Sequence, residues 1–298
     1  MLIPIVALLV ATVSGCGTAG PAESGRPLVL TTFTVIADIA RNVAGEHLEV
    51  ESITKIGAEI HGYEPTPGDL RRAAGADLIV DNGLGLEAWF DQLLEDVDAP
   101  RVTVSAGVEP IDIAADAYAG RPNPHAWMSP RNVEIYVENL VTAFTELDPA
   151  NGADYAANGE AYAAELRAVH DDLVERLGSL AADERALVTC AGAFSYLARD
   201  TDLTEIYIWP VNAEQQATPQ QIAAVIDEVD ADGIPAVFCE STVSDRAMQQ
   251  VVDATGTRFG GTLYVDSLSE PDGPVPTYLD LVRYNAATIA EALAGGSG

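Results

Sequence analysis

Residues 153–180 read ADYAANGEAYAAELRAVHDDLVERLGSL. Apolar side chains recur through this stretch at helical spacing and fall on one face: Tyr155, Tyr162, Leu166, Val169, Leu173 and Leu177. This spacing predicts one amphipathic helix. At about 1.5 Å per residue the helix extends over roughly 40 Å, about the length of a domain. A helix of that length is a candidate rigid connector between two parts of the chain.

Short β-rich runs alternate with helical patterns on both sides of this helix. The predicted strands are Leu28–Thr34, Leu48–Thr54, Asp77–Val80, Arg101–Ser105, Ala186–Cys190, Leu203–Trp209, Ala236–Cys239 and Thr262–Val265. The predicted helices are Asp38–Gly45, Pro67–Ala74, Leu86–Asp98, a segment that begins at Pro130 after the N-cap Ser129, Ala193–Arg199, Pro219–Val229, Ser244–Ala254 and Thr277–Leu293. The alternation predicts an α/β fold of two lobes, 28–150 and 182–298, with mostly parallel sheets. The long helix at 151–181 joins them, and the cleft between the lobes is the expected binding place.

Composition excludes one class of partner. The chain has 298 residues, 48% of them hydrophobic, so a sizeable core is available. The formal net charge is −31. Such an acidic surface repels phosphate backbones, so we expect no nucleic-acid partner.

The first residues predict export. Residues 2–13 are apolar apart from one Pro and one Thr, which is the length of a signal-peptide core and too short to span a bilayer. Ser14 and Gly15 then precede Cys16, as in a bacterial lipobox. We therefore expect a signal peptide at 1–15, lipidation of Cys16, and a flexible tether at 16–27, which would anchor the protein extracytoplasmically to the cell membrane. The alternative is a buried N-terminal strand or helix.

The remaining two cysteines, Cys190 and Cys239, each end a predicted strand of the second lobe. In an oxidising compartment an even pair of cysteines is a candidate disulfide. If the two strands are neighbours, their ends lie within bridging range. The alternative is two separate buried thiols.

Two of the four histidines lie where an α/β fold places ligand groups. His61 and His125 occupy irregular segments between predicted elements. The alternative for each is a loop histidine with satisfied hydrogen bonds. His47, in a polar turn, and His170, on the polar side of the long helix, are expected at the surface.

Two acids extend this pattern into the second lobe. Glu240 and Asp266 each follow a predicted apolar strand and are expected to project from the carboxyl edge of the sheet into the cleft. Two imidazoles with carboxylate oxygens suit manganese, iron or zinc better than calcium or magnesium. The residues alone thus indicate a transition-metal site.

Six segments, taken in order and spacing, resemble the manganese/zinc class of ABC-importer solute-binding lipoproteins across the whole mature chain. These segments are His61–Pro67, Asn82–Trp89, Pro124–Trp127, Thr218–Pro219, Glu240–Thr242 and Val265–Leu268. The resemblance implies a divalent metal cargo held by His61, His125 and Asp266, and a membrane permease as partner. It also implies two lobes bridged by one stiff helix. Several zinc-specific members carry a His-rich or acidic loop where this chain has none, between Val108 and His125, which favours Mn²⁺ over Zn²⁺ or Fe²⁺.

The chain departs from the family at the third ligand, which precedes Gly-Ala-Phe. The residue at that position is Ala191, whose methyl group cannot bind a metal. Water can complete the shell, Glu240 can swing in as an auxiliary ligand, or the change can disable the site. Cys190 is a further donor, but as a strand neighbour of Ala191 its side chain should point the other way.

These observations predict a monomeric metal-capturing lipoprotein and not an enzyme. One alternative is an adhesin-like or structural surface lipoprotein with a degenerate metal site, which Ala191 favours. A second is a metal-dependent hydrolase that uses an open coordination position with Glu240 as its base. The sequence has no His-Glu-x-x-His pair and no Gly-x-Ser-x-Gly elbow to support catalysis.

Overall fold

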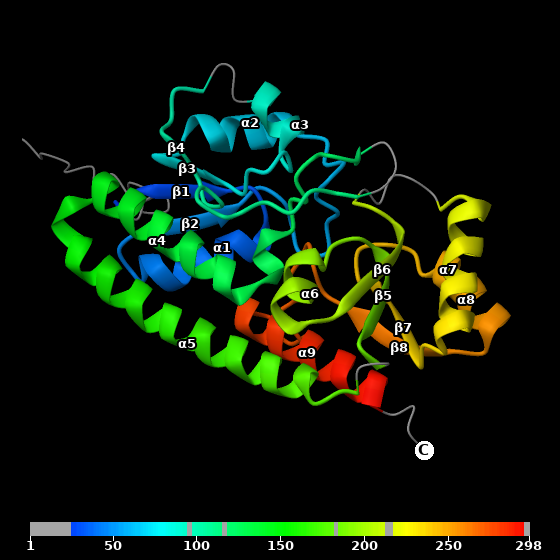
Figure 1. The fold of residues 1–298 in the computed structure, drawn as a ribbon. Helices are drawn as coiled ribbons and strands as arrows, with labels where there is room; N and C mark the ends of the chain where they lie inside the picture. The colour runs from blue at the N-terminus through cyan, green and yellow to red at the C-terminus, as the bar shows by residue number, and fades with distance from the viewer. Residues whose placement is uncertain (1–24, 94–96, 115–117, 182–183, 212–216, 295–298) are drawn as a thin grey trace, which may run out of the picture.

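The computed structural model describes residues 25–93, 97–114, 118–181, 184–211 and 217–294. The first half of the chain forms one parallel sheet in the order β2-β1-β3-β4. Its strands are β1 (Leu28–Thr31), β2 (Glu49–Ser52), β3 (Leu78–Asp81) and β4 (Arg101–Thr103). Helices α2 (Pro67–Ala74) and α3 (Ala88–Leu93) lie on one face, and α1 (Thr34–Ala44) and α4 (Pro130–Leu147) lie on the other (Figure 1).

The second half contains two parallel strand pairs. They are β5 (Ala186–Ala191) with β6 (Thr204–Trp209), and β7 (Ala236–Glu240) with β8 (Arg258–Leu263). Strands β5 and β7 lie beside each other and are joined by a disulfide between Cys190 and Cys239. The helices of this half are α6 (Ser195–Thr201), α7 (Pro219–Asp232), α8 (Arg246–Thr255) and α9 (Tyr278–Ala294). The predicted α/β class with mostly parallel sheets is confirmed.

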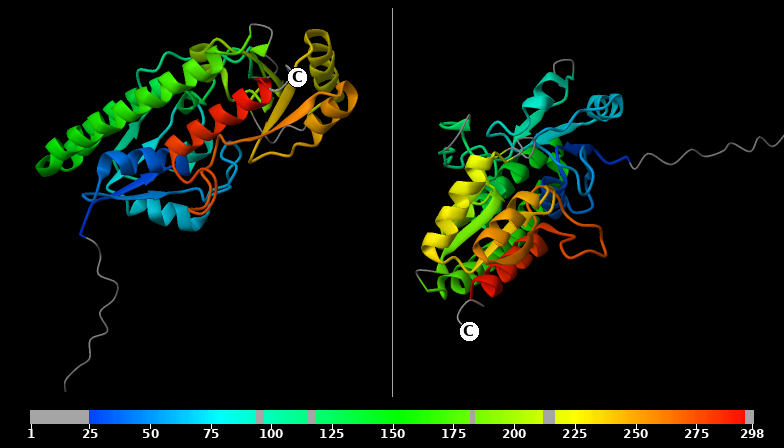
Figure 2. Two further views of the ribbon diagram at one scale, coloured as in Figure 1. Left: turned by 90° about the horizontal axis from the view of Figure 1, so that it is seen from below. Right: turned by 90° about the vertical axis from the view of Figure 1, so that its right-hand side faces the viewer.

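The long helix α5 (Gly152–Gly178) runs along the molecule beneath both halves (Figures 1 and 2). It packs against α1 and α4 from the first half and against α6 and α9 from the second. All six residues of its predicted apolar stripe are buried. The helix therefore belongs to a core shared by both halves.

Capping explains where two of the helices begin. Ser129 accepts a hydrogen bond from the Asn132 backbone N–H, and Pro130 occupies the first turn of α4, as its sequence predicts. Thr66 and Asp69 form a reciprocal capping box at α2. The described residues also include two short 3-10 helices, η2 (Ala126–Met128) and η3 (Pro149–Asn151).

Several predicted boundaries differ from the structure, and the largest differences lie around α1 and β8. Strand β1 ends at Thr31 and not at the predicted Thr34, and helix α1 begins at Thr34 and not at the predicted Asp38. Val35 and Ile36, which neither prediction covered, are buried in this helix. Strand β8 begins at Arg258 and ends at Leu263, earlier than the predicted Thr262–Val265. The start of this strand was missed because Gly260 interrupts the sequence pattern typical of a strand. Only glycine fits at this position, since a Cβ atom would lie 2.5 Å from the Phe238 ring. Asp266 therefore stands beyond the strand in an irregular segment.

None of the described helices is long and apolar enough to cross a membrane. The predicted signal peptide, Cys16 and the tether as far as residue 24 lie outside the described residues.

Candidate metal centre

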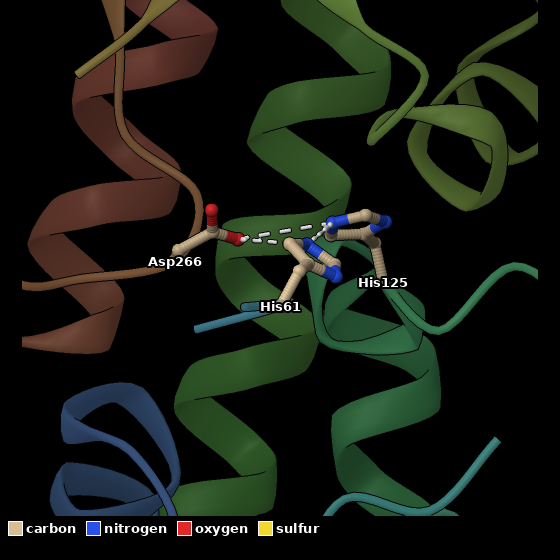
Figure 3. A group of neighbouring side chains, drawn as sticks. All are labelled: His61, His125 and Asp266. Atoms are coloured by element: carbon tan, nitrogen blue, oxygen red, sulfur yellow. Dashed lines mark hydrogen bonds and ion pairs between the residues drawn. The ribbon is translucent and has the colours of Figure 1, made fainter. Parts of the chain in front are cut away.

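Three side chains converge where the two halves meet. His61 comes from the segment between β2 and α2, His125 directly precedes η2, and Asp266 lies between β8 and α9. Their side chains point toward one another (Figure 3). The two Nε2 atoms are 3.0 Å apart, and Asp266 Oδ1 lies 3.9 Å from His61 Nε2 and 3.7 Å from His125 Nε2. Potential ligand atoms of all three residues lie within 4.8 Å of one another, which is suitable spacing for one metal ion.

Burial shifts the pKa values of His125 and Asp266. His125 is 1% exposed, and burial, followed by the neighbouring His61, lowers its pKa well below the usual value. Burial raises the pKa of Asp266, and His61 partly offsets this. The buried Asp266 Oδ1 has no hydrogen-bond partner among the described residues. A buried acceptor without a donor, facing two imidazole nitrogens, fits a cation.

Hydrogen bonds orient two of the three candidate ligands, His125 and Asp266. The side-chain N–H groups of Asn123 donate to the Gly192 carbonyl and the Ser195 hydroxyl, so its Oδ1 faces His125. At 2.8 Å that oxygen accepts from the Nδ1–H of His125, which leaves the Nε2 lone pair for a metal. Thr242 Oγ1 donates to Asp266 Oδ2 over 3.1 Å and so leaves Oδ1 for the site.

The sequence did not single out Asn123 or Thr242 as functional. Thr242 lies in the segment Glu240–Thr242, two residues after Glu240, and Asn123 immediately precedes the segment Pro124–Trp127, two residues before His125. A polar residue close to a candidate ligand was the available signal. Its partner depends on the fold, because Thr242 and Asp266 lie on different segments.

Ala191, at the end of β5, is 7% exposed and offers no ligand atom. Its backbone N–H donates to the carboxylate of Glu240. Burial raises the pKa of Glu240 to about 8. The carboxylate of Glu240 lies close to the sulfur atoms of Cys190 and Cys239 and does not belong to the cluster of the two histidines. The cysteines are 4.9 Å apart at Cα and form the predicted disulfide, so neither presents a free thiolate.

The other two histidines lie elsewhere. His47 Nε2 lies 2.9 Å from Asp154 Oδ2 at the surface. His170 is half-buried on α5, and its Nδ1 has no partner among the described residues. His170 was expected at the surface, but it is only partly exposed, and burial lowers its pKa.

The chain is similar to known proteins over most of its length. Residues 29–292 match the family model described as zinc-uptake complex component A, periplasmic. The iron-binding protein YfeA of Yersinia pestis is 52% identical over 273 residues, covering 91% of this chain and 88% of that protein. The manganese ABC transporter substrate-binding lipoprotein PsaA of Streptococcus mitis is 33% identical over 298 residues, covering 97% of this chain and 96% of that protein.

A solved structure shows the same fold. The Mn-bound periplasmic metal binding protein from Candidatus Liberibacter asiaticus is 37% identical, with a TM-score of 0.84 over 90% of this chain and 100% of that one. The family model matches nearly the whole described chain, and the similar proteins carry metals or belong to metal importers by name. The chain therefore belongs to the family of zinc-uptake complex component A, the metal solute-binding class that its sequence motifs resemble.

Proposed function

We propose that this chain is an extracytoplasmic solute-binding lipoprotein that captures a divalent transition metal, with manganese favoured and zinc or iron as the other candidates, for an ABC importer. The single observation that carries this proposal is the convergence of His61, His125 and the orphaned Asp266 Oδ1. Neutral imidazoles and one carboxylate match the ligand preferences of these metals. Capture and release need no chemistry on the cargo, so we expect transport and not catalysis.

The proposal includes an organisation of the chain. Residues 1–15 are a signal peptide, and 16–27 are a tether that begins at the lipidated Cys16. Two lobes, 28–150 and 182–298, are joined by a connecting helix at 151–181. We expect a monomer that is anchored to the cell membrane and docks on the importer's permease.

Mechanistically, both histidines bind the cation through neutral Nε2, and Asp266 supplies negative charge. Asn123 holds His125 in the tautomer that ligates, because its carbonyl oxygen accepts the Nδ1 proton. Ala191 leaves one position of the shell to water or another group. Affinity then depends strongly on the charge and placement of Asp266.

Titration calorimetry with Mn²⁺ and Zn²⁺ on the tether-trimmed, metal-stripped protein tests the proposal. His61→Ala should abolish binding, while His47→Ala, which removes a histidine at the surface, should not. Ala191→Glu should tighten binding if a missing third ligand limits affinity. Tight binding by the unsubstituted chain with no gain from Ala191→Glu would mean that another group already completes the shell.

Ala191 also favours a second candidate function, a structural or adhesin-like surface lipoprotein with a degenerate site. That candidate predicts no heat of binding with either metal. It also predicts that Ala191→Glu alone creates binding where none existed.

A further inference from the structure

The peptide carbonyl directly before each of the three ligands accepts a hydrogen bond from a side-chain N–H. Trp89 Nε1 donates to the Ile60 carbonyl over 3.0 Å, immediately before His61. Trp127 Nε1 donates to the Val265 carbonyl over 3.0 Å, immediately before Asp266.

The third case uses an amide in place of an indole. Asn82 Nδ2 donates to the Pro124 carbonyl over 2.9 Å, immediately before His125. Asn82 and Trp127 are fully buried, and Trp89 is half-buried.

These bonds act on the ligands through the covalent geometry of the peptide. A carbonyl shares its plane with the N and Cα atoms of the next residue, so fixing the carbonyl fixes the backbone from which the ligand side chain extends. We propose that Asn82, Trp89 and Trp127 are positioning residues that hold His61, His125 and Asp266 in place for the metal. This inference rests on the proposed function and deepens it, because it identifies what pre-organises a site with only three protein ligands.

The donors are themselves held rigidly. Asn82 Oδ1 accepts from the Tyr136 hydroxyl, and the Asn82 backbone N–H donates to Glu87 Oε1. Glu87 Oε2 also accepts from the Gly83 N–H, which closes a tight turn. Gly83 has φ of 82°, and a Cβ there would lie 2.3 Å from Thr103 Cγ2, so only glycine fits.

This turn connects Asn82 to Trp89, so one short segment supplies donors for both histidine segments. The Trp89 ring packs on Tyr63 with centroids 5.0 Å apart, two residues beyond His61. The segment Asn82–Trp89 was noted in the sequence only for its resemblance to the family. Its role in this proposal is to donate hydrogen bonds to the carbonyls before His61 and His125.

Trp127 has a different task, because it links the two halves. It stands in η2 next to His125, and its ring packs against His125 and Phe33 with centroids 5.0 and 4.9 Å apart. Its indole N–H holds the second-half segment that carries Asp266. This hydrogen bond therefore helps to set the separation of the carboxylate from the histidines, together with the bonds from the Gly57 N–H to Ser267 Oγ and from the Leu268 N–H to Thr34 Oγ1.

The chain provides a matched control. Its third tryptophan, Trp209, is also buried at 5% exposure, yet its Nε1 has no hydrogen-bond partner within the described ranges. Trp→Phe at each position removes the indole N–H and part of the ring. Only at Trp89 and Trp127 does it also free a carbonyl next to a ligand.

The test measures Mn²⁺ affinity by the electron paramagnetic resonance signal of free Mn²⁺, in the unsubstituted full chain and in Trp89→Phe, Trp127→Phe and Trp209→Phe. Loss of such an outer hydrogen bond should weaken binding about 10- to 100-fold at Trp89 and Trp127. Trp209→Phe should leave the affinity unchanged. Thermal unfolding of the metal-free variants is measured alongside, because a merely structural role would lower stability without changing the affinity of the folded protein.

The outcomes separate this inference from the proposed function. Mn²⁺ binding by the unsubstituted chain with equal affinity in all three variants overturns the positioning role and leaves the proposed function intact. No binding by the unsubstituted chain overturns both. If Trp127→Phe fails to fold, the half-buried Trp89→Phe decides: weakened binding supports the role, and unchanged binding overturns it.

Discussion

The backbone N–H of Ala191 donates to both carboxylate oxygens of Glu240, at 3.2 and 3.1 Å. Glu240 is 4% exposed, and burial raises its pKa to about 8, with Asp266 as a smaller like-charge contribution. A carboxyl with this pKa is largely protonated near neutral pH. The free energy of unfolding of the metal-free protein therefore depends on pH through the protonation of Glu240.

Glu240→Gln should reveal this pH-dependent contribution to stability. Because the folded pKa lies above the ordinary value of 4.5, the contribution of Glu240 is fully present below pH 4.5 and is lost as pH rises through about 8. Glutamine cannot ionise, and its amide oxygen can still accept from Ala191. Denaturant unfolding of the metal-free proteins should therefore show Glu240→Gln gaining stability over the unsubstituted chain as pH rises from about 5 to about 9.

The exposed Glu160→Gln is the control for this prediction, since it removes the same charge from the surface. It should show no comparable gain. A stability difference for Glu240→Gln that stays constant across the pH range would contradict the assignment.

Metal affinity should fall as the pH is lowered. Protons compete with the metal for the imidazole lone pairs and for the carboxylate of Asp266. The pKa of Asp266 is raised by burial. Burial lowers the pKa of His125, so this residue stays ready to ligate below the usual titration range of histidine. Calorimetric titration with Mn²⁺ between about pH 7.5 and about pH 5 should show progressive weakening. An affinity that does not change over this interval would argue against the proposed ligand set, because protons should compete with the metal for Asp266 at its raised pKa.

Reduction of the Cys190–Cys239 disulfide should destabilise the protein. The bridge closes a loop with a sequence separation of 49, and a loop of this size contributes about 2–4 kcal/mol through the entropy of the unfolded chain. Urea unfolding with and without a phosphine reductant measures this loss. The Cys190→Ser, Cys239→Ser double variant should unfold at the same urea concentration under both conditions, and alkylation of the non-reduced protein should find neither thiol free.

The candidate site shows which features can be predicted from the sequence. Strand ends and motif spacing identified His61, His125 and Asp266 because ligand groups of α/β folds gather at predictable edges. The hydrogen bonds that hold them join residues remote in sequence, such as Trp127 and Val265, and no local pattern encodes such pairs. The candidate ligands could be predicted from the sequence, and the hydrogen bonds around them could not.

The same reasoning applies to the fold. The stripe on α5 was readable because its period persists over many turns. Strand β8 was misplaced because Gly260 is selected by its close contact with Phe238, a tertiary constraint that reads as a break in the pattern. Errors therefore fall where long-range packing decides the residue.

Gly192 is tightly packed and also contacts the residue that orients His125. Its N–H donates to the Trp209 carbonyl, and its own carbonyl accepts from Asn123, the residue that orients His125. A Cβ at Gly192 would lie 2.4 Å from the Pro210 carbonyl oxygen, which is backbone and cannot move aside. Gly192→Ala must therefore displace the segment after β5.

We expect Gly192→Ala to lower the free energy of unfolding by about 1–3 kcal/mol through overpacking, and also to weaken Mn²⁺ binding because Asn123 loses its anchor. Gly178→Ala is the matched control, since a Cβ there meets nothing within 4 Å and alanine favours the helical conformation. It should be neutral or stabilising and leave the affinity unchanged. Loss of stability in Gly192→Ala with full metal affinity would show that the Asn123 bond to Gly192 is structural and does not support the ligand.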